Sequence, residues 1–108
     1  MHELSLATAI VDTCVDRAAG GRILRIRVEV GQLAAVLPDS LRFCFELCAQ
    51  GTTAEGATLE ILETPGHAEC LTCGETITLS SPLGRCVCGG RLRITAGEQL
   101  RIRDMEIA

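Results

Sequence analysis

Four cysteines in two close pairs limit the fold of this chain more than any other feature of its sequence. Two residues lie between Cys70 and Cys73, one residue lies between Cys86 and Cys88, and residues 74–85 separate the pairs. Pairs at this distance are typical of a zinc ribbon, in which two turns face each other and four thiolates surround one Zn(II) ion. The pattern therefore predicts a closed, structural zinc site formed by all four cysteines.

The tight spacing of the second pair leaves two alternatives beside this prediction. A Cys-x-Cys pair cannot form the same turn as Cys-x2-Cys, so His67 could replace one thiolate. A redox role is the other alternative, but redox C-x2-C motifs open a helix, and residues 74–78, GETIT, lack a helical pattern. Gly74 and Gly89, which follow the two pairs, favour turns whose N–H groups point at sulfur. Metal binding is the preferred interpretation.

The length and cysteine count limit the domain organisation and the compartment. With 108 residues the chain can form one small core and an appended metal module, but not two full cores. Seven cysteines, an odd number, do not make a complete disulfide framework and indicate a reducing compartment. No apolar run approaches the roughly 18 residues of a membrane span, and the N-terminus lacks a signal-peptide pattern. We expect a cytoplasmic protein that does not bind membranes.

Charge and aromatic content argue against nucleic-acid binding. The formal net charge is −4, and the chain contains two aromatic residues, Phe43 and Phe45. Proteins that bind nucleic acid need clustered cations to neutralise phosphates, and single-strand binders also need aromatic rings on which bases stack. We therefore expect no nucleic-acid partner, and a core formed mainly by aliphatic side chains.

Two segments have the apolar spacing of amphipathic helices. The first covers residues 4–19 and ends at Gly20, and the second begins after Pro38, with Asp39 or Ser40 as its expected N-cap, and continues to about residue 51. Three further cysteines lie on the apolar faces of these helices and are expected to pack as small hydrophobes: Cys14, Cys44 and Cys48. The i, i+4 spacing of the last two leaves metal binding as an alternative.

Three segments alternate between apolar and polar residues as half-buried strands do. They are residues 22–30, with Leu24, Ile26, Val28 and Val30 on one face, residues 57–65, and residues 99–107, whose phase changes at Asp104 as in a β-bulge. The order of elements predicts an α+β fold with a small three-stranded sheet, two helices on one face of it, and an inserted zinc-ribbon-like module.

This order also predicts a discontinuous domain organisation. Residues 1–66 and 96–108 are expected to form the α/β domain, and residues 67–95 the zinc-binding insert. The insert has too few apolar residues to pack a core of its own, so we expect the metal to hold it together.

The first three residues, MHE, suggest a second metal site. A large second residue protects the initiator methionine from removal, so the α-amine of Met1 is retained. That amine, the backbone nitrogen of His2 and the His2 ring nitrogen can close two fused chelate rings, which suit square-planar Ni(II) or Cu(II). The residues alone leave an inert, exposed His2 as the alternative, and for Glu3 a role in supporting a helix N-terminus.

The motifs together resemble a known family. MHELSLA at the start, RFCFELCAQGTTAEGATLEI in the middle, and the cysteine pairs followed by RLRITAGEQLRIRDMEI resemble the HypA/HybF family of nickel-insertion accessory proteins for hydrogenase maturation. The resemblance covers the whole chain. It implies that His2 is the essential nickel ligand with Glu3 as a supporting ligand, and that Cys70, Cys73, Cys86 and Cys88 hold structural zinc. The family pattern normally has C-x2-C where this chain has Cys86-Val87-Cys88.

The resemblance further implies a metallochaperone that is not an enzyme. It would carry Ni(II) as cargo and, with a maturation GTPase, deliver it to the precursor of the nickel–iron hydrogenase large subunit, with urease as a second client. A homodimer is the oligomer to consider, although the sequence does not reveal the oligomeric state. The alternatives are a zinc-ribbon protein-interaction or nucleic-acid-binding module, which would need a basic face, and a thiol–disulfide enzyme, which tight zinc binding would disfavour.

Overall fold

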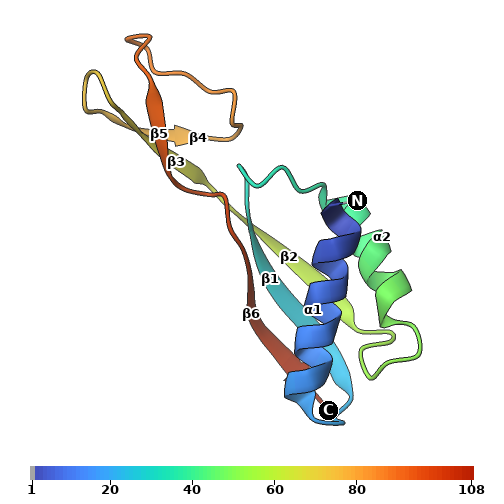
Figure 1. Ribbon diagram of the computed structural model, residues 1–108. Helices are drawn as coiled ribbons and strands as arrows, with labels where there is room; N and C mark the ends of the chain where they lie inside the picture. The colour runs from blue at the N-terminus through green and yellow to red at the C-terminus, as the bar shows by residue number, and fades with distance from the viewer. Residues whose placement is uncertain (1) are drawn as a thin grey trace. The chain divides into compact units, whose positions relative to one another are not determined.

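The structure, a computed structural model, describes residues 2–108 and contains two helices and six strands within that range. In chain order these elements are α1 (His2–Ala18), β1 (Ile23–Gly31), α2 (Pro38–Ala49), β2 (Thr58–Thr64), β3 (Gly66–Cys70), β4 (Thr76–Leu79), β5 (Leu92–Ala96) and β6 (Leu100–Ile107) (Figure 1). The described chain divides into two compact units. The first comprises residues up to 28, 36–62 and 101–108, and the second comprises residues 29–35 and 63–100.

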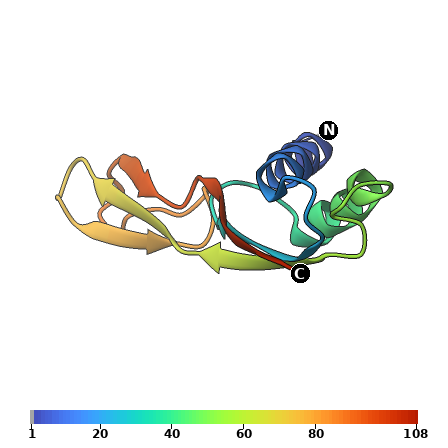
Figure 2. The same ribbon diagram turned by 90° about the horizontal axis from the view of Figure 1, so that it is seen from below.

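The first unit has the predicted α+β architecture. Its sheet has the strand order β2-β1-β6, so the last strand of the chain pairs beside the first. Figure 2 shows both helices on the same face of this sheet. The prediction of a three-stranded sheet covered on one face by two helices is confirmed. That each unit folds as a domain of its own remains a prediction.

The apolar stripe of α1 is buried, as its spacing predicts. Its buried residues recur at three- and four-residue intervals: Ala7, Ile10, Val11, Cys14 and Ala18. Burial of an aliphatic side chain such as Ile10 contributes about 1.5–3 kcal/mol. Glu3 in the first turn places a negative charge at the positive end of the helix macrodipole, and Arg17 in the last turn places a positive charge at its negative end. Both charges stabilise the helix.

The beginning of α2 differs from the prediction. Leu37 is the N-cap in an extended conformation, and Pro38 is the first helical residue, so the expected N-cap residues Asp39 and Ser40 lie inside the first turn. Proline suits this position because its fixed φ matches the helix and its missing N–H would have no intrahelical acceptor. Cys48, expected on the buried face, is partly exposed.

The sheet confirms the alternation of β1 in part. Ile26, Val28 and Val30 are buried, but Leu24, expected on the same buried face, is 45% exposed, and Ile23 is buried instead. Ile23 and Ile26 are three positions apart, so the period-two burial pattern begins at Ile26 and does not extend to the first residues of the strand.

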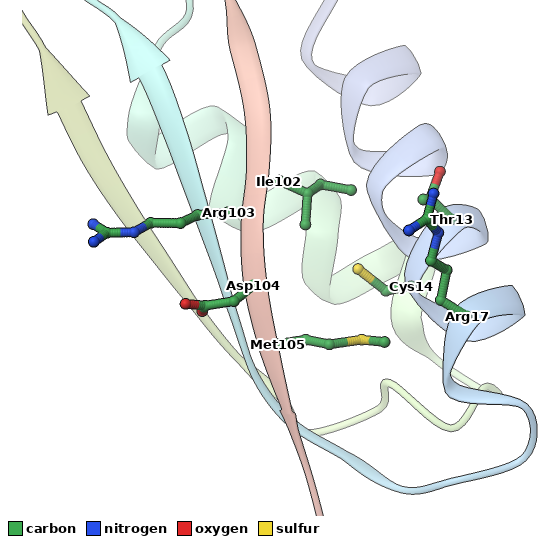
Figure 3. A pocket seen from close by; sticks show the side chains of 7 residues that line it. All are labelled: Thr13, Cys14, Arg17, Ile102, Arg103, Asp104 and Met105. Atoms are coloured by element: carbon green, nitrogen blue, oxygen red, sulfur yellow. The ribbon is translucent and has the colours of Figure 1, made fainter.

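The predicted phase change in the last strand is present. Figure 3 shows Ile102 and Met105 directed towards α1, whereas the consecutive residues Arg103 and Asp104 point away from it. Two consecutive outward side chains restore the apolar phase, as a β-bulge does. On the outer face Arg27 of β1 donates from Nε to Asp104 Oδ1 at 2.7 Å, which ties β1 to β6.

The second unit contains a sheet that the sequence did not predict. Its strand order is β4-β3-β5, and β3 pairs antiparallel with both neighbours. The insert contributes to a small apolar cluster that its composition did not predict. Leu33, Ala68 and Leu79 are buried together, with three partly buried side chains packed against them: Ile77, Leu92 and Ile94. Leu33 completes this core from outside residues 67–95, which is why the composition of the insert alone did not reveal it.

Three glycines allow close backbone packing in the second unit. A Cβ atom at Gly97 would lie 2.4 Å from Gly66 Cα, and one at Gly31 would lie 2.0 Å from the carbonyl oxygen of Gly97. Gly97 also has a φ of +100°. A larger residue at Gly97 would therefore meet both a steric and a conformational barrier.

Candidate metal centres

The four predicted zinc cysteines lie together in the second unit. Each offers one sulfur atom, and the four sulfurs lie within 4.8 Å of one another. Cys70 is the last residue of β3, Cys73 lies in the turn that follows, and Cys86 and Cys88 lie in the loop before β5. The hairpin β3–β4 and the pairing of β3 with β5 therefore hold the two cysteine pairs opposite each other.

Both cysteine pairs adopt tight turns. Gly74 N–H donates to the Cys70 carbonyl at 3.0 Å, and Gly89 N–H donates to the Cys86 carbonyl at 2.9 Å. Both glycines have positive φ, +77° at Gly74 and +78° at Gly89, a conformation that other residues rarely adopt. The shortened second pair thus closes a turn of its own, as the glycine positions predict.

Backbone N–H groups point at the sulfurs. Cys73 N–H donates to Cys70 Sγ at 3.5 Å, and Gly90 N–H donates to Cys88 Sγ at 3.3 Å. Sulfurs also approach across the pairs, at 3.4 Å for Cys70–Cys88 and 3.6 Å for Cys73–Cys86. Donors to sulfur stabilise thiolates, which are the form that binds a metal.

The thiols differ in acidity because they lie so close together. The N–H groups of Cys73 and Thr72 lower the pKa of Cys70 to about 6. At Cys86 the N–H of Cys88 acts in the same direction, but contacts with the Cys88, Cys73 and Cys70 sulfurs, together with desolvation, raise its pKa to about 12. Several thiolates can therefore coexist here only when a cation neutralises them.

This donor set fits a closed zinc site. Four convergent sulfurs suit the tetrahedral preference of Zn(II), which when bound supplies folding energy to a small module. Within the described residues the cluster contains Cys70, Cys73, Cys86 and Cys88 and does not contain His67. His67 lies within β3, where it pairs with Thr78 and Ala96.

The remaining three cysteines lie in the helices. Cys14 and Cys44 are buried, and Cys48 is partly exposed, with its sulfur 3.5 Å from Thr8 Oγ1. Desolvation raises the pKa of Cys14, which keeps its thiol neutral. Cys44 and Cys48 are not part of a group of three or more metal-ligating side chains among the described residues.

The N-terminal pair of candidate nickel ligands lies in the first turn of α1. His2 is exposed, and its Nδ1 lies 3.8 Å from the Glu3 carboxylate. The same carboxylate accepts a hydrogen bond at 3.3 Å from the N–H of Leu37, the N-cap of α2. This N–H, followed by the helix backbone and His2, lowers the pKa of Glu3, so the carboxylate stays charged. The predicted Met1 amine lies outside the described residues.

The contact between Glu3 and Leu37 was missed at the sequence level. It joins residues 34 positions apart, and a backbone donor leaves no trace in residue type. The signal that could have found it is Pro38, because proline at the first helical position places the preceding N–H at an open helix end.

A hollow of the first unit lies between α1 and β6. It has a volume of about 260 Å³ and is lined by residues that include Cys14, Arg17 and Met105 (Figure 3). A lone neutral thiol beside one guanidinium does not form a catalytic or metal-binding constellation. In the part of the chain that the structure describes, no helix is both long enough and apolar enough to span a membrane.

Comparison with known proteins finds one family that matches the chain over nearly its whole length. Residues 1–107 match the family model described as "Hydrogenase/urease nickel incorporation, metallochaperone, hypA". A hydrogenase maturation factor HypA from Nostoc punctiforme is 46% identical over 99% of this chain and 96% of its own.

Solved structures share the fold. A solution structure of a HypA protein has a TM-score of 0.70 at 22% identity and covers 100% of this chain and 97% of its own. The solution structure of the Ni metallochaperone HypA from Helicobacter pylori has a TM-score of 0.66 at 20% identity, with coverages of 97% and 96%.

Proposed function

Since the chain belongs to the HypA family of metallochaperones for nickel incorporation into hydrogenase and urease, we propose that it binds its Ni(II) cargo at the N-terminus, through His2 with Glu3 in support. The family consists of maturation factors, so the expectation that the protein is not an enzyme is confirmed. The cargo is then released to the precursor of a nickel–iron hydrogenase large subunit, with urease as a second client.

The position of Glu3 carries this proposal. Its carboxylate lies 3.8 Å from His2 Nδ1 and is held by the Leu37 N–H at 3.3 Å. A negative charge kept beside the imidazole favours a cation at that nitrogen, and a carboxylate held by a second helix is oriented before the metal arrives.

The helix end supplies a further reason. N–H groups in the first turn of a helix have no acceptor within the helix. His2 is the first residue of α1, so a metal ion can displace the proton of its backbone nitrogen into solvent without breaking an intrahelical hydrogen bond. Together with the Met1 amine and the ring nitrogen, this nitrogen forms the planar chelate that suits Ni(II). An exposed site of this kind can also release its ion, as a chaperone must.

Calorimetric nickel titration at neutral pH tests the site. His2→Ala is expected to abolish nickel binding with unchanged zinc content, because His2 is exposed and lies outside the core. Glu3→Gln keeps an acceptor for Leu37 but loses the charge, and should weaken nickel binding about tenfold or more. His67→Ala is the matched control, since it removes the second of the two histidines. If the His2→Ala variant takes up one nickel per chain with unchanged affinity, the N-terminal site does not exist.

Extension of the N-terminus tests the amine separately. Residues added before Met1 convert the amine to an amide and should weaken nickel binding, because the first chelate ring loses its best donor. Unchanged affinity would remove the amine from the ligand set while leaving His2 in it.

We further propose that Cys70, Cys73, Cys86 and Cys88 hold one structural Zn(II). Their convergence within 4.8 Å and the N–H groups directed at Cys70 and Cys88 support this assignment. X-ray absorption at the zinc edge should show four sulfur neighbours at about 2.3 Å. Three sulfurs and one nitrogen would instead bring His67 into the site.

Partners and compartment complete the proposal. All seven cysteines, each within the described residues, are unpaired, which suits the reducing cytoplasm and the thiolates that zinc requires. A maturation GTPase and the hydrogenase precursor are the proposed partners, and a homodimer is the proposed oligomer. Nucleic acid and membranes are not proposed as partners, because the net charge of −4 opposes both.

A further inference from the structure

An apolar surface remains uncovered beside the first turn of α1 and along one face of α2. Four of its large side chains are strongly exposed: Leu4 at 44%, Leu37 at 63%, Phe43 at 63% and Leu47 at 49%. Phe43 is one of the two aromatic residues of the chain, and the other, Phe45, is 2% exposed in the core. Aromatic residues are weaker helix formers than the alternatives available at an exposed position, so helix stability does not account for Phe43.

Three of these side chains, Leu4, Phe43 and Leu47, line a groove in the first unit. The groove has a volume of about 420 Å³ and lies between the first turn of α1 and one face of α2; its lining includes Glu3, Leu4, Asp39, Phe43 and Leu47. Asp39, Phe43 and Leu47 follow one another at four-residue intervals and thus form one row along α2. The row begins with a carboxylate and continues with two large apolar side chains.

The charge of the groove indicates what can occupy it. Among the described lining residues the charged ones are Glu3 and Asp39, both acidic. An anionic membrane surface would be repelled by them. A second copy related by a two-fold axis would bring its own Glu3 and Asp39 to the same interface, where like charges oppose association. A cationic and apolar partner is the complement that remains.

We propose that this groove, the α1–α2 groove, docks an amphipathic helix of a partner protein that presents large aliphatic side chains followed by at least one arginine or lysine. A groove between two helices with apolar anchors at four-residue spacing is the arrangement that receives such a helix. The aliphatic side chains cover Phe43, Leu47 and Leu4, and the cation pairs with Asp39.

The groove lies next to the proposed nickel ligands. Glu3 lines the groove and lies 3.8 Å from the His2 ring, so a helix seated there brings its protein beside the proposed nickel ligands. In this respect the inference rests on the proposed function, because the partner is then a protein that supplies or receives nickel. The docking itself needs no metal.

Binding to designed peptides tests the proposal on the full-length, zinc-loaded protein without nickel. The probe is a stapled helical peptide of about 15 residues with a leucine stripe and an arginine at one end. The control peptide is identical except that glutamate replaces the arginine. The arginine peptide should bind, with NMR shift changes concentrated at α2 and the first turn of α1. The glutamate peptide should bind about tenfold more weakly.

Variants of the protein locate the site. Phe43→Ser and Leu47→Ser should each weaken binding of the arginine peptide about tenfold, and Asp39→Asn should reduce the preference for arginine over glutamate. Leu24→Ser is the matched control, since Leu24 is 45% exposed but lies on β1 outside the groove. It should bind within about twofold of the parent protein.

Several outcomes would overturn the proposal. These are absence of arginine-peptide binding, equal loss in the Leu24→Ser control, self-association of the parent chain that Phe43→Ser abolishes, and binding to phosphatidylserine vesicles that depends on Phe43. His2→Ala separates the two hypotheses, because it should abolish nickel binding and leave peptide binding unchanged. Loss of peptide binding with intact nickel binding would defeat only the docking.

Discussion

The two compact units of this molecule solve the same folding problem with different means. The first covers a three-stranded sheet with two helices and buries a continuous set of large side chains, among them Ile10, Ile26, Leu41 and Phe45. The second buries Leu33, Ala68 and Leu79 in a small cluster and gathers four cysteines at its loops. Where a segment offers little apolar surface, metal ligands can supply the missing stability.

The difference also concerns the two candidate metal centres. The four-cysteine cluster is built into the second unit, where pairing of β3 with β4 and β5 holds the sulfurs together. The His2 and Glu3 pair lies at an exposed helix end, held through Glu3 by the N-cap of α2. One arrangement suits a permanent ion and the other an ion in transit.

Removal of zinc should produce the largest difference in stability between the two units. Cys70→Ala, or a chelator, should lose the metal and disorder the second unit, because bound structural zinc contributes about 10–16 kcal/mol in small modules. The first unit, whose core contains no ligand cysteine, should stay folded. Amide exchange measured by mass spectrometry distinguishes the units by peptide. Simultaneous melting of all peptides would show that the two regions form one cooperative unit.

The hydrocarbon core offers the converse test. Phe45→Ala should destabilise the first unit by about 3–5 kcal/mol, because the ring is 2% exposed and its removal leaves a cavity. Phe43→Ala removes the same ring from a 63% exposed position two residues away and should change stability by less than about 0.5 kcal/mol. Denaturant unfolding followed by circular dichroism measures both. A zinc content that falls in Phe45→Ala would contradict the independence of the second unit.

Glycine substitutions compare the backbone of the two units. Gly97→Ala should destabilise the second unit by about 1–3 kcal/mol or more, because its Cβ would lie 2.4 Å from Gly66 Cα at a φ of +100°. Gly51→Ala in the first unit has a similar φ of +78°, but no described atom lies within 4 Å of its Cβ, so the cost is about 1 kcal/mol. Amide exchange at β3 and α2 measures the pair. Equal effects would mean that the close approach in the second unit relaxes easily.

The smallest expected effect is the loss of one ion pair of the first unit in acid. The Arg27 hydrogen bond lowers the pKa of Asp104 in the folded state. A depressed pKa stabilises the fold at neutral pH, and this contribution disappears as the pH falls through the lowered value. Asp104→Asn should therefore unfold at slightly lower denaturant concentration at pH 7 and coincide with the parent at about pH 2, below the ordinary range of aspartate. The exposed residue Asp12 supplies the control, Asp12→Asn. A difference that persists in acid would assign the effect to packing.

Most local structure could be predicted from residue patterns, and the failures share a cause. The helices and the three long strands follow from apolar spacing, which depends on neighbours in the chain. The exposure of Leu24, the partial exposure of Cys48 and the core completed by Leu33 depend on which surfaces meet, and residue type carries little information about that. Leu37 replaced Asp39 and Ser40 as N-cap because proline at the first helical position outweighed the preference for a polar cap.

The sequence by itself determined the amphipathic faces, the glycine turns and the candidate ligands of both proposed centres, because these rest on side-chain chemistry and on contacts within a few residues. Only the tertiary structure decided that β6 pairs beside β1 and that Glu3 is held by an N–H group 34 positions away. It also decided that Leu4 and Phe43 border one groove. Such contacts join segments whose separation is closed by the burial of the whole core, and no local pattern encodes their partners.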